Sequence, residues 1–179
     1  MIRYHQAIRD ELRRLNYGPQ KDETVHGVGI VQFIVTCTSN PESVLNRVRS
    51  LLSLVDQIAL EGWLSDKQWI SRLPKWFVGA CATQKTPEEA ERWLMWWKSL
   101  AREEQANEEA NAIWSLENWT YWMKYENRQW YWWDAKLAND DTHIFVAVQA
   151  ESWPFPWGAL RWLFRAAGAS DVRNKDEPS

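Results

Sequence analysis

Two apolar segments joined by a short polar turn decide the expected fold: residues 129–137, QWYWWDAKL, and residues 142–150, THIFVAVQA. Both segments alternate between the two faces of an extended chain and are rich in aromatic and β-branched residues, as strands are. The connecting residues 138–141, ANDD, include Asn and Asp, which tolerate turn geometry. The pair therefore predicts a β-hairpin.

The first of these strands carries four consecutive large aromatics, and the chain has 15 Trp among its 179 residues. Alternation along a strand predicts that Trp130, Trp132 and Asp134 share one face. Tyr131 and Trp133 then share the other face. Three arrangements fit this pattern: helices that cover both faces, an exposed aromatic patch that anchors a partner, and a surface that stacks on carbohydrate.

The rest of the chain predicts helices mixed with two further strands. Helices are expected over residues 2–15, 41–60, a short segment from Ser65, 87–111, 116–123 and 157–167, and strands over 25–37 and 75–82. The segment 25–37 is apolar on both faces, which is typical of a strand in the middle of a sheet. Thr86, followed by Pro87 and by Glu89, forms a capping box at a helix start. This order favours an α+β fold: a small, mostly antiparallel sheet with a C-terminal hairpin and helices packed on one face.

Length and charge set the broad class of protein. A chain of 179 residues predicts a single domain over 1–179, with an N-terminal helix within 1–19, closed by Gly18 and Pro19, and a frayed tail at 170–179. The net charge of −3 argues against sequence-independent binding to nucleic acid. No apolar run approaches the length of about 18 residues that spans a membrane, and the charged N-terminus is no signal peptide. We therefore expect a cytoplasmic protein with buried free thiols at Cys37 and Cys81, and a disulfide between them is the alternative.

Motifs for common catalytic chemistry are missing from the sequence. The histidines His5, His26 and His143 have no helical metal-site spacing, and no GxSxG, GxGxxG or GxxxxGK[ST] motif occurs. We expect no catalytic residue, no metal and no cofactor, and a binding protein is favoured over an enzyme. The alternative is an enzyme, or a domain that binds a small ligand or carbohydrate, with a Trp-lined pocket. Its polar groups would be His26, Arg128, Asp134 and His143.

An acidic run contains no Lys or Arg between residues 103 and 118. Glu104 and Glu108 are four residues apart on a predicted helix, where like charges destabilise slightly. The run is compatible with a solvated face, with a contact surface for a basic partner, or with a carboxylate-bridged metal site. The predicted binding residues are acidic or are Trp: Glu103, Glu104, Glu108, Glu109, Trp114, Glu117, Trp119, Trp122, Trp130, Trp132 and Asp134.

Three Trp-rich segments accompany the acidic run: WSLENW at 114–119, QWYWWD at 129–134 and WPFPWGALRW at 153–162. In these features, its size and its mild acidity, the chain resembles as a class the small cytosolic immunity proteins that neutralise bacterial polymorphic or contact-dependent toxins. The resemblance implies a monomer or dimer that inhibits a basic, toxin-like protein by tight association. It assigns no role to an individual residue.

Overall fold

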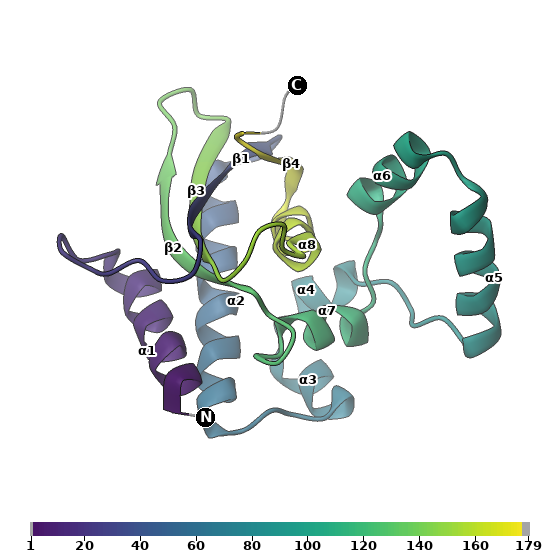
Figure 1. Ribbon diagram of the computed structural model, residues 1–179, viewed down its shortest axis with the longest axis horizontal. Coiled ribbons are helices and arrows are strands. Elements are labelled where there is room, and N and C mark those ends of the chain that lie inside the picture. Colours follow the sequence, from purple (N-terminus) through teal and green to yellow (C-terminus); the bar gives the residue numbers. More distant parts are fainter. Residues whose placement is uncertain (1, 177–179) are drawn as a thin grey trace.

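The computed structural model describes residues 2–176, which form a four-stranded antiparallel sheet with helices around it (Figure 1). The helices are α1 (Ile2–Tyr17), α2 (Pro41–Glu61), α3 (Asp66–Arg72), α4 (Lys75–Ala80), α5 (Pro87–Ser99), α6 (Arg102–Asn111), α7 (Leu116–Met123) and α8 (Gly158–Ala167). The strands are β1 (Gly29–Cys37), β2 (Trp130–Leu137), β3 (His143–Ala150) and β4 (Ala169–Asn174), in the order β2-β3-β1-β4. The α+β class, the antiparallel sheet and the β2–β3 hairpin are confirmed.

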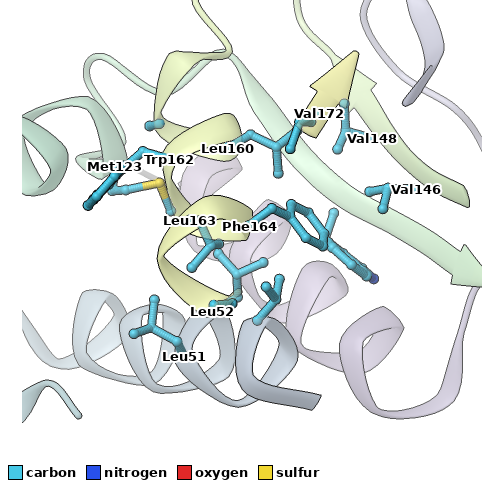
Figure 2. Packing of buried hydrophobic residues seen from close by; sticks show 14 of the residues in the cluster. Leu51, Leu52, Met123, Val146, Val148, Leu160, Trp162, Leu163, Phe164 and Val172 are labelled. Carbon is cyan, nitrogen blue, oxygen red and sulfur yellow. The ribbon is translucent and has the colours of Figure 1, made fainter. Parts of the chain in front are cut away.

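Helices α2 and α8 bury one face of the sheet. In Figure 2, Phe164 of α8 extends toward Val146 of β3, and Leu52 of α2 lies beneath the same helix. Side chains on the opposite face are more open, and Phe145 of β3 is 47% exposed. The apolar strand predicted for 25–37 is β1, which lies between β3 and β4 and so occupies the interior of the sheet.

A bulge in β2 changes which side chains of the aromatic stretch reach the core. The register between β2 and β3 shifts between Trp132 and Asp134, which leaves Trp133 as an extra residue. An extra residue reverses the alternation that follows it. Trp130 and Trp132 are buried, and Ala135 rather than Asp134 is the next buried residue. The expectation that Asp134 shares a face with the two Trp is therefore wrong.

Residues 75–82 were expected to be a strand, and most of them form helix α4 instead. Pro74 stands immediately before the first helical residue, where its fixed φ is well tolerated. Phe77 is the buried residue of this helix, and α4 packs against α8. This tertiary packing overrides the strand propensity of Phe and Val.

The single helix expected over 87–111 is two helices that break at Leu100 and Ala101. Leu100 has an extended backbone that ends α5. The Ala101 N–H then donates to the Glu104 carboxylate at 2.8 Å, which starts α6 in the manner of a capping box. The predicted capping box at Thr86 is confirmed, since Glu89 accepts from the Thr86 N–H at 2.8 Å.

The prediction of a frayed tail from residue 170 is wrong for its first part. Ala169–Asn174 form β4, which pairs with β1. Gly168 ends α8 with a φ of 116°, a left-handed conformation that glycine adopts readily, and the chain turns back to the sheet there. Ala169 and Val172 are the apolar residues that β4 buries. Residues 177–179 lie outside the described residues.

The structure also bears on the two cysteines and on the expected lack of a membrane-spanning helix. Cys37 is buried, Cys81 is half-buried, and both are free thiols. Among residues 2–176, the structure has no helix with the length and apolar character needed to cross a bilayer.

Candidate functional site

Residues 83–114 leave the body of the protein as an arm built from α5 and α6 (Figure 1). The base of the arm is closed by a parallel bridge between Ala82 and Ser115, and the Ala82 N–H donates to the Trp114 carbonyl at 2.9 Å. The Arg165 guanidinium of α8 donates to the Ala110 carbonyl at 2.7 Å, near the end of α6. The arm is thus held at its base and at α6, while α5 lies furthest from the sheet.

Helix α5 has no buried residue although it carries three Trp. Trp93 is 39% exposed and Trp96 is 45% exposed, and the Trp97 side chain is half-buried. The ring centroid of Trp93 lies 6.5 Å from that of Trp96 and 6.3 Å from that of Trp97. The three indoles therefore form one surface, which we call the aromatic face of α5. Leu94 lies at the border of this face and is also exposed. Exposed apolar patches are characteristic of interaction sites, which makes this face a candidate contact surface.

The carboxylates predicted to steer a partner lie on α6, directly after this face. Glu103, Glu104, Glu108 and Glu109 are all exposed, and none forms an ion pair with any residue the structure describes. The Gln105 side chain donates to the Trp97 carbonyl at 3.0 Å and so ties α6 to α5. Aromatic and acidic groups are thus carried on the same arm.

The Trp residues predicted to anchor a partner do not form an exposed group. Trp119 and Trp132 are 0% exposed and Trp130 is 1% exposed, so the expectation of exposure is wrong for these three. Trp114 and Trp122 are half-buried against the core. Helices cover these rings because α7 packs against α8 and α1 lies along β2. The exposed indoles are instead Trp93 and Trp96 on α5 and Trp153, which is 55% exposed in the loop after β3.

Two other predicted residues lie apart from the α6 carboxylates. Glu117 is half-buried in the first turn of α7. Burial raises the pKa of the Cys81 thiol, and the neighbouring Glu117 carboxylate raises it further. Asp134 lies on the open face of the sheet, 3.9 Å from the Lys136 ammonium. Sequence reasoning missed Trp93 and Trp96 as contact residues, although the polar composition of 101–112 offered no apolar surface to cover them.

A second concave surface lies between α1, the loop 18–28 and the edge of the sheet. This cleft has a volume of about 840 Å³, and Tyr4, Tyr125 and Tyr131 contribute to its lining. His26 and Arg128 also line it, as the alternative hypothesis requires. No Trp lines this cleft, and the expectation that all four polar groups converge is wrong, because only His26 and Arg128 are brought together here. His143 and Asp134 are placed elsewhere in the fold, with His143 at the far end of β3.

Two carboxylates and one guanidinium are buried beneath the cleft. Glu11 of α1 and Asp56 of α2 are both 0% exposed, and each accepts from Arg128, with a distance of 3.2 Å between Arg128 Nη1 and Asp56 Oδ1. Glu11 also accepts from the Trp132 N–H and so joins α1 to β2. The Arg128 guanidinium lies over the Trp130 ring, 4.4 Å from its centroid. Burial, with the nearby Glu11 charge, raises the pKa of Asp56 well above its usual range.

This arrangement predicts a pH-dependent effect of Asp56→Asn. A carboxyl whose folded pKa is raised stabilises the fold fully below its unfolded pKa of about 3.9 and loses that contribution as pH rises through the folded value. Asn keeps an acceptor for Arg128 and a donor for Glu11 but has no titrating proton. Urea unfolding from pH 4 to 8 should show the variant gaining stability relative to wild type by up to about 1.4 kcal/mol per pH unit. Parallel pH profiles for the two proteins would contradict a protonated Asp56.

Comparisons with known proteins add no functional assignment. No family model, no curated protein and no solved structure matches the chain. Within residues 2–176, the structure contains no cluster of three or more His, Cys, Asp or Glu side chains able to hold a metal ion. The arm and the cleft are therefore the two surfaces from which a function can be argued.

Proposed function

We propose that this chain binds a basic partner protein through the arm and inhibits it, in the manner of toxin immunity proteins. The observation that carries the proposal is the exposure of Trp93 and Trp96 on α5 next to the exposed carboxylates of α6. The arm stands out from the body, so a partner can approach both helices together.

The aromatic face supplies the chemistry that dominates protein interfaces. A Trp side chain buries about 150–250 Å² when it is covered. A stable interface needs about 800 Å² from each partner, and Trp is among the residues that contribute most of its binding energy. Covering Trp93, Trp96 and the adjacent Leu94 would provide the apolar centre of such an interface.

The carboxylates of α6 supply charge complementarity. Glu108 and Glu109 have no cationic partner among the described residues, so their field is available to an approaching protein. Unpaired surface charge of one sign accelerates association with a protein of the opposite sign and disfavours other partners. A helix pair that enters a basic cleft also occludes that cleft, which is how binding would inhibit the partner.

Paired substitutions in the arm test this proposal. The immobilised protein is used to capture partners from a lysate of the native host, in parallel with Trp93→Ser/Trp96→Ser and Glu108→Lys/Glu109→Lys. Loss of two central Trp anchors should weaken affinity for the captured partner by about 100-fold or more. The Lys pair should instead slow association and reverse its salt dependence. Glu104 is left intact because its carboxylate caps α6.

Matched controls separate the arm from the rest of the surface. Tyr121→Ser removes an aromatic that is 57% exposed on α7, and Glu61→Lys reverses an exposed charge at the end of α2. Both controls should retain the partner with wild-type affinity and rate. Equal retention by the arm variants and the controls would refute the proposal.

A further inference from the structure

We infer that the cleft beside α1 binds an organic cation, a ligand that carries an ammonium or guanidinium group. This inference concerns a different surface from the arm and does not rest on the proposed function. It follows from three properties of the cleft: its aromatic wall, the ion pairs that its arginines already form, and the two carboxylates that form none.

The wall and floor of the cleft present tyrosine rings. The ring centroids of Tyr4 and Tyr125 are 4.2 Å apart, which makes a continuous aromatic wall from α1 to the segment after α7. Tyr131 is buried below them, and burial raises its pKa to about 12, so the phenol stays neutral. The volume of about 840 Å³ is in the range of small-ligand sites. The faces of aromatic rings attract cations, most strongly where water is partly excluded.

The cationic groups of the cleft are already paired with acceptors of the protein itself. Arg13 and Arg14 both pair with Glu23, at 2.8 Å for Arg14. Arg14 is only 4% exposed, and its Nε also donates to the Trp132 carbonyl at 2.7 Å. Arg128 pairs with the two buried carboxylates beneath the cleft. These guanidinium groups therefore have little capacity left to attract an anionic ligand.

Two carboxylates that line the cleft have no such partner. Neither Asp10 nor Glu151 forms an ion pair with any residue in the described chain, and both line the same cavity. The Gln6 side chain donates to the Asp10 carboxylate at 3.0 Å. Glu151 is close enough to add to the raised pKa of Tyr131. These two carboxylates outweigh the one positive charge that remains because Arg13 and Arg14 share Glu23. The net negative charge stands beside tyrosine rings, the combination that recognises a cation.

Such a cation has two possible sources, a free amine or the Lys or Arg side chain of a protein. Isothermal titration of the full chain with agmatine, with the amidated peptide Gly-Arg-Gly and with inorganic phosphate tests the inference and separates the sources. We expect saturable 1:1 binding of a cationic probe and none of phosphate. Tighter binding of agmatine would indicate a free amine, and tighter binding of the peptide would indicate a protein side chain.

Variants locate the binding. Asp10→Asn and Glu151→Gln should each weaken the cationic probe about fivefold, the effect of one charge near the ligand in a solvated site. Tyr125→Ala should weaken it as well, and Tyr125→Phe should retain it. Asp171→Asn, an exposed carboxylate on β4, and the arm variant Trp93→Ser/Trp96→Ser should bind as wild type does. Binding of phosphate alone, or wild-type affinity in both cleft carboxylate variants, would overturn the inference, whatever the outcome for the arm.

Discussion

Replacing Arg128 with Met will lower the free energy of unfolding by about 3–5 kcal/mol, because removal of the cation from a buried ionic cluster leaves buried carboxylate charge uncompensated. Glu11 and Asp56 are 0% exposed, and Arg128 is the guanidinium that both of them contact. Met retains most of the apolar stem, so the loss reports the charge rather than packing. Since α1, α2 and β2 all meet at this cluster, the whole fold should lose stability.

Urea unfolding at pH 7 measures this loss. Arg72→Met is the matched control, because Arg72 is exposed at the end of α3 and its replacement should change stability by less than about 0.5 kcal/mol. A loss for Arg128→Met as small as that of the control would show that the cluster does not hold α1 and α2 to the sheet.

Replacing Trp119 with Ala will lower the free energy of unfolding by about 3–5 kcal/mol, whereas replacing Trp96 with Ala will change it by about 0.5 kcal/mol or less. Trp119 is 0% exposed, its Nε1–H donates to the Ala159 carbonyl at 3.0 Å, and its ring meets Phe77 at a centroid distance of 4.5 Å. Trp96 is 45% exposed on a helix without buried residues. The two changes remove the same side chain from two different environments.

The same urea titrations check this pair of variants. The difference in the loss of unfolding free energy between the two variants tests whether Trp119 lies in the core and Trp96 on the exposed arm. A Trp96→Ala variant as destabilised as Trp119→Ala would mean that α5 packs against the body in solution, and the aromatic face would then be part of the core.

Local signals in the sequence predicted much of the fold because they act over a few residues. Asn40 accepts from the N–H groups of Glu42 and Ser43 at the start of α2, and Gly168 ends α8, as the capping rules require. The hairpin between β2 and β3 is likewise set by its own turn residues. Features that depend on distant contacts were not predicted. The helix at Lys75–Ala80 and the bulge at Trp133 depend on packing against distant parts of the chain, which short-range propensity does not predict.

At the candidate site, too, local signals were predictable from the sequence and distant contacts were not. The number of Trp indicates that some indole must lie outside the core, but it does not indicate which. Trp93 and Trp119 both occur on short amphipathic helices, and only the position of each helix separates them. Helix α7 lies under α8, whereas α5 stands away from the sheet on the arm (Figure 1). The predicted carboxylates of α6 are exposed as an interaction surface needs, because α6 has no apolar side to bury.

Hydrogen–deuterium exchange of the chain, free and bound to its captured partner, tests the central claim most directly. If the arm is the docking surface, amides of α5 and α6 (Pro87–Asn111) become protected on binding, while the amides of β4 (Ala169–Asn174) exchange at unchanged rates. Protection that appears elsewhere and leaves Pro87–Asn111 unaltered would contradict the claim that this arm engages the partner.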